Sequence, residues 1–217
     1  IWKIFTLSSE YYIKYTTNRQ IKETNDFNSI SEQYDIVNDN FTNDFTTNKL
    51  TNRIGLFLNY RFRKQRIKIG AFARNVSIEN FVLNDSTINQ SIVNFLPQVN
   101  YTYKFSNSKR FRFNYKTNSS QPSINQLQPV LNNSNPNRIT VGNSNLVPNY
   151  VHNFNLRYNT WKALTGSYIF TGLTYRLTQD AFSSSVEYDS IGRTISKTVN
   201  IDNNQNGYFY FGGGIPL

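Results

Sequence analysis

Hydrophobic and polar residues alternate along several stretches of this chain. Between residues 109 and 117, three aromatic side chains alternate with basic and amide side chains, and the same pattern recurs in residues 54–62, 93–105 and 154–158. Alternation with a period of two places each kind of side chain on its own face of a β-strand. No stretch repeats with the 3.6-residue period of a helix. The pattern therefore predicts an all-β fold.

The connections between these candidate strands alternate in length. Short polar turns and long polar excursions follow one another across about eight candidate strands. Outer-membrane β-barrels have this asymmetry, with tight turns on the periplasmic side and long loops outside. We therefore predict an antiparallel, up-and-down transmembrane β-barrel segment of about eight strands, forming one unit over residues 1–217. The short turns are expected near residues 63–65, 106–108 and 162–163, and the long loops near residues 18–48, 84–90, 119–149 and 189–193.

Aromatic residues gather beside the short turns. Amphipathic rings favour the headgroup level of a membrane, so these residues are predicted to form the periplasmic aromatic girdle of a barrel. The alternative is that the rings fill the core of a soluble sandwich. The alternation of loop lengths favours the girdle. The residues are Phe62, Tyr101, Tyr103, Phe105, Phe111, Phe113, Tyr158 and Trp161.

The composition narrows the classes of protein that fit. Hydrophobic residues make up 38% of the chain, aromatic residues 16%, and the mean hydropathy is −0.56. The high aromatic content argues against a disordered chain. The absence of cysteine excludes disulfides and thiol chemistry. The sequence has no run of about 18 apolar residues, the length of a membrane helix, but strands of a membrane barrel carry a much weaker hydropathy signal.

Signals of catalysis and metal binding are scarce. His152 is the only histidine, and without a second histidine or any cysteine a zinc site would need mostly carboxylates, which is unusual. The acidic residues lie mostly in predicted loops and form no calcium-loop motif, and no glycine-rich phosphate loop opens a helix. We expect no catalytic residue, no cofactor and no metal, and a protein that is not an enzyme. A hydrolase would need a Ser–His–acid cluster around His152.

The net charge of +10 raises the question of an anionic partner. Sheets that bind single-stranded nucleic acid present aromatic rings and cations on one surface. Here the two kinds of side chain fall on opposite faces of each predicted strand, which fits a barrel wall that is apolar outside and polar inside. We therefore expect no nucleic-acid partner. The cations predicted to face the lumen, where they would favour anions, are Arg61, Lys104, Arg112 and Lys116.

Residues 121–158 carry the most specific sequence signal, a polar loop that leads into an alternating strand. Its fixed positions are Gln121, Pro122, Ser123, Gln126, Leu127, Pro129, Asn135, Gly142, Asn143, Leu146, Pro148, His152, Phe154, Asn155, Leu156 and Tyr158. These spacings resemble the pattern QPS…QL.P…N…..GN..L.P, followed by H.FNL.Y, in the outer-membrane β-barrels of TonB-dependent receptors from Bacteroidetes. The resemblance does not identify a substrate.

The resemblance implies both a location and a function. Such receptors have barrels of about 22 strands with a plug domain in the lumen, so this chain would be a fragment, about one third of a barrel. The plug, the N-terminal energy-coupling segment and the final strand would be missing. The barrel would contact lipid in the bacterial outer membrane. Its loops near residues 18–48 and 119–149 would bind a scarce solute, such as an iron chelate, an oligosaccharide or a peptide, and the TonB energy-coupling complex would drive import.

The residues leave a second interpretation open. A small complete β-barrel or β-sandwich would act as a cell-surface binding or adhesion module, with no transport. Eight strands can close into a barrel whose interior is just filled by side chains, which would exclude the passage of a solute. Pairing between the first and last strands would favour this module, whereas a curved open sheet would favour the receptor fragment.

Overall fold

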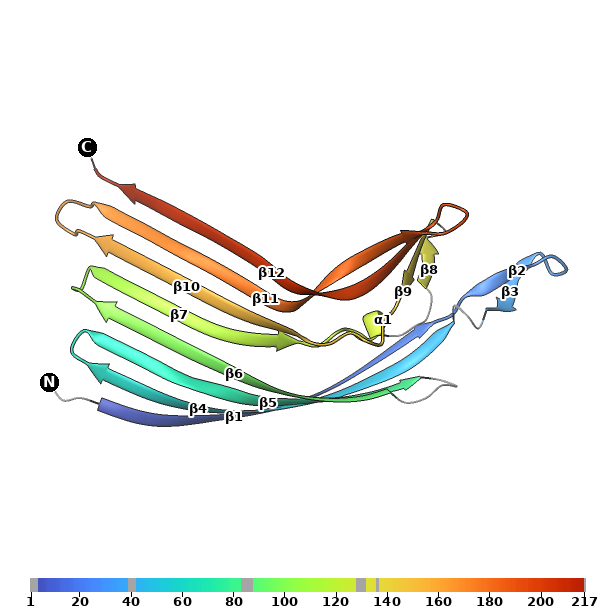
Figure 1. Cartoon of the computed structure of the whole chain (residues 1–217), viewed down its shortest axis with the longest axis horizontal. Coiled ribbons are helices and arrows are strands. Elements are labelled where there is room, and N and C mark those ends of the chain that lie inside the picture. The colour runs from blue at the N-terminus through green and yellow to red at the C-terminus, as the bar shows by residue number, and fades with distance from the viewer. Residues whose placement is uncertain (1–3, 39–41, 83–87, 128–131, 136, 217) are drawn as a thin grey trace.

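The computed structural model describes residues 4–38, 42–82, 88–127, 132–135 and 137–216, most of which lie in β-strands (Figure 1). Among the described residues, eight long strands form most of a ten-stranded sheet, and the short elements occupy two of the long connections. This confirms the all-β prediction. The long strands are β1 (Ile4–Lys22), β4 (Asn43–Phe62), β5 (Gln65–Val82), β6 (Ile88–Lys104), β7 (Lys109–Ser120), β10 (Asn149–Trp161), β11 (Tyr168–Tyr188) and β12 (Thr194–Gly214). The short elements are β2 (Asn25–Asn28), β3 (Gln33–Val37), α1 (Ile124–Leu127), β8 (Asn132–Asn135) and β9 (Arg138–Val141).

The long strands form one open antiparallel sheet. Its order is β1-β4-β5-β6-β7-β10-β11-β12, so each long strand pairs with the next one along the chain. β1 lies at one edge and does not pair with β12, whose other side is joined by β9 in parallel register and then by β8. Figure 1 shows the strands bending together, with the chain reversing at both ends. The predicted barrel segment is confirmed, whereas the described residues do not form the alternative, a small closed barrel.

The first predicted long loop is shorter than expected. β1 continues to Lys22 and β4 begins at Asn43, so Asn18 lies in the sheet, opposite Thr47. Only the middle of residues 18–48 is a connection, and it folds into the β2–β3 hairpin. Backbone hydrogen bonds can continue along strands whatever the polarity of their side chains. The polar side chains at these strand ends therefore led to the prediction of a loop where the backbone is in fact paired in the sheet.

The other connections follow the prediction with smaller corrections. β7 ends at Ser120 and β10 begins at Asn149, so the ends of the predicted loop at residues 119–149 are paired in the sheet. Residues 84–87 of the predicted loop at 84–90 lie outside the described residues, and the remainder belongs to β6. The turn after β10 spans residues 162–167 and is longer than predicted.

The register divides the sheet into two faces, because residues directly opposite each other on neighbouring strands share a face. Thr6 lies opposite Asn59, which lies opposite Lys68, and we call the face that carries these residues the polar face. The other face, the apolar face, carries most of the exposed large hydrophobic side chains of the strands. They include Phe5, Leu7, Tyr11, Ile13, Ile54, Leu56, Leu58, Ile69, Val93, Phe95, Leu173, Phe209 and Phe211.

The apolar face is continuously apolar only next to the short turns. On β4 this apolar part covers residues 54–62, and the next residue outward on the same face is Asn52. On β5 it covers residues 67–73, and the next residue outward on the same face is Asn75. A strand needs about 9–11 residues to cross a membrane. On β4 this apolar band therefore has the length of one crossing, on β5 it is two residues shorter, and the outer parts of both strands extend beyond it.

A small buried cluster interrupts the polar face. The ring of Phe57 packs edge-on against that of Phe72, with centroids 4.9 Å apart, and Leu96 completes the cluster. Gly55 and Gly70 lie beneath the rings, because a Cβ atom at either position would collide with them. Glycine in a strand permits this close approach. The alternating pattern did not predict these apolar residues on the polar face.

Candidate functional site

The four cations predicted to face the lumen lie on one face of the sheet. Arg61 of β4 is opposite Arg66 of β5, which is opposite Thr102 of β6 and then Arg112 of β7. Lys104 lies two residues after Thr102 on β6 and therefore on the same face. Lys116 lies opposite Gln98, which is four residues before Thr102 on β6 and also shares its face. The register therefore places all four predicted cations on the polar face.

The polar face is strongly basic. On β1, β4, β5, β6, β7 and β10, its described side chains include twelve Lys or Arg residues and a single carboxylate, that of Glu10. Sequence analysis identified four of the twelve. Counting in steps of two along the same strands from those four adds Lys49, Arg53 and Arg110, and the strand register supplies the remainder. The twelve are Lys14, Lys49, Arg53, Arg61, Arg66, Lys68, Arg74, Lys104, Arg110, Arg112, Lys116 and Arg157.

Four of these arginines form a row across the strands, which we call the arginine row. Arg61 and Arg66 are directly opposite each other, as are Arg112 and Arg157. Only Thr102 separates the two pairs. Neighbouring strands lie about 4.8 Å apart, so the row extends over about 20 Å.

A second row, rich in amide side chains, lies two residues farther from the short turns. It consists of Asn59, Lys68, Asn100, Asn114 and Asn155, each opposite the next in the sheet. Asn155 Nδ2 donates a hydrogen bond to Thr174 Oγ1 at 2.7 Å. This amide row adds neutral donors and acceptors beside the arginine row.

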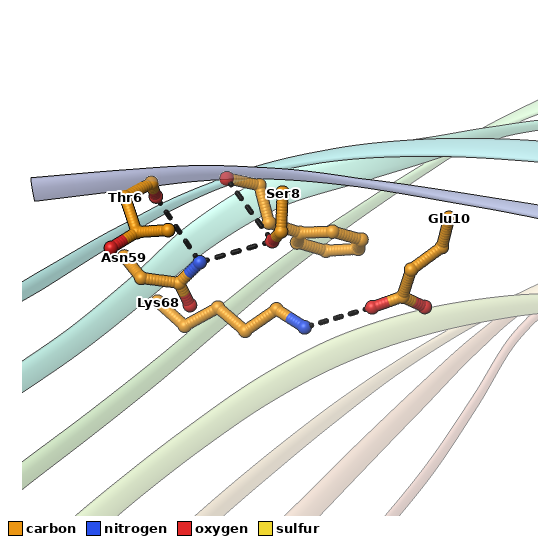
Figure 2. Close-up of polar contacts among 6 residues, drawn as sticks. Thr6, Ser8, Glu10, Asn59 and Lys68 are labelled. Carbon is orange, nitrogen blue, oxygen red and sulfur yellow. Dashed lines mark hydrogen bonds and ion pairs between the residues drawn. The ribbon is translucent and has the colours of Figure 1, made fainter.

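The single carboxylate on this part of the face already has a cation beside it. Lys68 Nζ lies 3.1 Å from Glu10 Oε1, and the same ammonium lies 4.0 Å from the centroid of the Phe57 ring (Figure 2). Asn59 Nδ2 donates to the Thr6 carbonyl at 3.2 Å and to Ser8 Oγ at 3.0 Å. Glu10 is thus engaged by Lys68, and among the described residues the arginine row has no carboxylate of its own.

Farther out, side chains bridge a gap between β6 and β7. The ladder between these strands stops beside Pro97, which has no N–H group to donate. Thr117 Oγ1 donates instead to the Pro97 carbonyl at 3.1 Å. Arg74 Nη2 reaches across from β5 to the Ser119 carbonyl at 2.6 Å. These bonds hold the two parts of the sheet together where the backbone ladder is interrupted.

The loop between β7 and β10 packs over the outer part of the polar face. Its residues Pro122 and Leu127, at either end of α1, are buried. Figure 1 shows α1 within the bend of the sheet. Together with strands β1, β4 and β5 the loop lines an open pocket of about 480 Å³. The pocket is lined by Asn18, Arg19, Gln20, Thr47, Lys49, Ile78, Asn80, Pro122, Ser123 and Leu127.

The same loop is also attached to β12. Asn143 Nδ2 donates to the Thr198 carbonyl at 2.9 Å. The Val147 N–H donates to Asn200 Oδ1 at 2.9 Å, and Asn200 Nδ2 donates to the Val147 carbonyl at 3.0 Å. β9 adds a short parallel ladder to the start of β12. The loop therefore spans from the β1–β4–β5 wall to β12.

The predicted motif residues take different places in this loop. Ser123 is exposed, and its N–H and Oγ both donate to Gln126 Oε1 at 2.9 Å. Pro129 lies outside the described residues. Buried motif positions are Pro122, Leu127, Gly142 and Leu146, and half-buried ones are Gln121, Gln126, Asn143 and Pro148.

His152 lies on the apolar face among aromatic and amide groups. Its Nδ1 is 3.0 Å from the Tyr115 hydroxyl and its Nε2 is 3.4 Å from Gln179 Oε1. The described residues do not place a serine and a carboxylate around this ring as a hydrolase would require. They also contain no group of three or more His, Cys, Asp or Glu residues that could hold a metal ion. No helix in the described part of the chain is long and apolar enough to cross a membrane.

One carboxylate holds the outer turn between β11 and β12. Asp189 Oδ1 accepts hydrogen bonds from the N–H groups of Ile191 at 3.0 Å and Arg193 at 2.8 Å, and Oδ2 accepts one from Arg193 Nε at 2.7 Å. The bond from the Arg193 side chain is the main cause that lowers the pKa of Asp189 below its ordinary value, and the backbone bonds add to it. Gly192 takes the left-handed conformation that this turn requires.

Comparison with known proteins places this sheet in a family. The sequence pattern of the outer membrane protein beta-barrel family matches residues 2–217. No curated protein matches the chain in sequence. Among solved structures, the chain is similar to the siderophore receptor PirA of Pseudomonas aeruginosa, with a TM-score of 0.47 and 13% identity over 97% of this chain and 48% of that one. It is also similar to the siderophore receptor PirA of Acinetobacter baumannii, with a TM-score of 0.47 and 11% identity over 95% of this chain and 40% of that one.

The chain spans less than half the length of these two receptors. The family match covers nearly all of its own residues and agrees with the alternating faces, the apolar band and the open sheet described above. We conclude that this chain belongs to the outer membrane protein beta-barrel family and that its place is the outer membrane.

Proposed function

We propose that this chain is part of the barrel wall of an outer-membrane receptor of the TonB-dependent type found in Bacteroidetes. In this proposal the apolar face contacts lipid and the polar face lines the lumen. The outer loops bind a scarce solute, and the TonB complex supplies energy from the inner membrane to import it. No covalent bond of the solute is made or broken.

The open sheet of eight long strands is the observation that carries this proposal. A closed barrel of eight strands is filled by its own side chains, whereas this sheet leaves one edge of β1 and most of one edge of β12 unpaired among the described residues. Unpaired edges favour the addition of further strands. A wider barrel built in this way has room for a solute, and it would leave the basic polar face lining the path.

The loop between β7 and β10, which carries the motif residues and which we call the motif loop, supports the binding role. It bridges from strands β1, β4 and β5 to β12 and lines an open pocket with the outer strand ends. Binding residues are commonly carried by loops on a rigid scaffold. We therefore assign the first contact with the solute to this loop and to the neighbouring strand ends.

A transport experiment with the full-length protein tests the proposal. Cells that make it would be given a labelled iron chelate, a labelled oligosaccharide or a labelled peptide, with and without a protonophore. We expect one of these to accumulate and its accumulation to stop when the proton gradient collapses, while binding at the cell surface persists. Binding without accumulation would indicate an adhesion module, and accumulation that is insensitive to the protonophore would indicate a passive pore.

A further inference from the structure

The arginine row places like charges directly opposite each other. Arg61–Arg66 and Arg112–Arg157 are two such cross-strand pairs, and Lys104–Arg110 is a third. Like charges at opposed positions destabilise a sheet. Among the described residues, no side-chain hydrogen bond or ion pair to a carboxylate balances the four arginines of the row. The repulsion would be relieved by an anion that binds to this face.

A hollow beside the row has the right chemistry for such an anion. It has a volume of about 360 Å³ and is lined by both Arg61 and Arg66. Asn59, Asn100 and Thr102 also line it, and they contribute amide and hydroxyl donors. Arginine binds planar oxyanions through two parallel hydrogen bonds. The hollow therefore offers many donors and no carboxylate.

The neighbouring Lys68 provides an internal comparison. It lies in the adjacent amide row and has Glu10 beside it at 3.1 Å (Figure 2). The polar face thus supplies an acid for this cation but none for the arginine row, two residues away along the strand. Because the row runs across β4, β5, β7 and β10, it can contact several charged groups of one molecule at once.

We propose that the imported solute is an oxyanion with more than one carboxylate or phosphate group, and that the arginine row binds these groups. The inference rests on the proposed function, because it requires the polar face to line the path of the solute. Arg66 and Arg112, on either side of Thr102, hold the centre of the row.

Citrate is a suitable probe because it carries three carboxylates. We would titrate citrate into the purified full-length protein in detergent and follow the heat of binding at low and at physiological salt. The variant Arg66→Gln/Arg112→Gln is expected to bind citrate about ten- to a hundredfold more weakly than the unchanged protein, since charge-assisted hydrogen bonds are among the stronger polar contacts. Arg66→Lys/Arg112→Lys keeps the charge and is expected to recover part of the affinity.

The matched control is Arg63→Gln/Lys162→Gln, which removes the same charge from two turns at the same end of the sheet. Its affinity for citrate should stay within about twofold of the unchanged protein, since the lost cations lie outside the row and act only through screened, long-range attraction. The proposal is overturned if the unchanged protein does not bind citrate, if the glutamine variant of the row binds it equally well, or if the control loses as much affinity.

The two proposals can fail separately. Row-dependent citrate binding without energised accumulation of any solute would contradict the transport function and leave the anion site in place. Energised uptake of a neutral solute, retained in full by Arg66→Gln/Arg112→Gln, would contradict the anion inference and leave the transport function in place.

Discussion

Phe57 illustrates how a single residue shapes the polar face. It is 1% exposed, although the neighbouring positions Leu56 and Leu58 on the apolar face are 56% and 48% exposed. Its ring packs against Phe72 and lies under the Lys68 ammonium. The cluster is therefore a small packed core on the polar face, and Lys68 is held against it.

Phe57→Ala should destabilise the full-length protein by about 3–5 kcal/mol, the usual effect of removing a large aromatic side chain from a packed core. Urea-induced unfolding in detergent would measure the change. Phe27→Ala is the control, because Phe27 is 54% exposed on the β2–β3 hairpin and Tyr34 is its one aromatic neighbour in the described part of the chain. We expect a loss of about 1 kcal/mol or less there. Equal losses in both variants would show that the cluster has no special role.

At the scale of elements, the outer strand ends and turns depend on polar side chains. The β11–β12 turn is closed by Asp189 and Arg193, which lie four residues apart. The gap between β6 and β7 is bridged by Thr117 and Arg74 where Pro97 interrupts the ladder. At the gap, side-chain hydrogen bonds replace backbone pairing. In the turn, they add to the backbone bond from the Asp189 N–H to the Arg193 carbonyl, so the charge of the Asp189 side chain should affect how firmly the turn is held.

The β11–β12 turn should loosen in acid. Because the pKa of Asp189 is lowered in the folded protein, its stabilising effect is fully present above the unfolded value of about 3.9 and is lost as the pH falls through the lowered folded value. NMR of the Asp189 carboxyl carbon would measure the titration, and amide exchange at Arg193 would follow the turn. Asp189→Asn should remove this pH dependence. A carboxyl that titrates at or above its ordinary value would contradict the assignment.

Local alternation predicted some elements well and others poorly. The alternation in β7 around Phe111 and Phe113 correctly assigned its side chains to two faces, because one face there is aromatic and the other is basic or amide. The same rule failed for Phe57 and Phe72, because two glycines on neighbouring strands make room for rings on the polar face. It also shortened β1 and β4, whose polar ends pair by backbone hydrogen bonds and by the ion pair between Arg19 and Asp44.

The candidate site was predictable only in part. The four cations named from the sequence share one face of the sheet, but their order across the sheet depends on strand register, which alternation alone does not determine. The bridge from the motif loop to β12 joins Asn143 to Thr198, 55 residues apart, and no local pattern predicts such a contact. The loop was recognised from the spacing of its residues, whereas its contacts required the fold.

At the scale of the whole molecule, the proposed function requires the apolar face of the sheet to contact lipid. On β4 the apolar band next to the short turns has the length of one membrane crossing, and the opposite face carries twelve cations along its whole length. Exposing that many charges to lipid would be unfavourable. The orientation with the polar face toward an aqueous lumen follows from this difference.

The most direct test is the environment of consecutive positions along β4. This sequence contains no cysteine, so spin labels can be attached at Leu58→Cys, Asn59→Cys, Tyr60→Cys and Arg61→Cys in the full-length protein embedded in lipid. We predict that labels at 58 and 60 are relaxed by oxygen, which dissolves in lipid, and that labels at 59 and 61 are relaxed by a water-soluble nickel complex. Equal accessibility at all four positions, or the reverse alternation, would contradict the assignment of the polar face to the lumen.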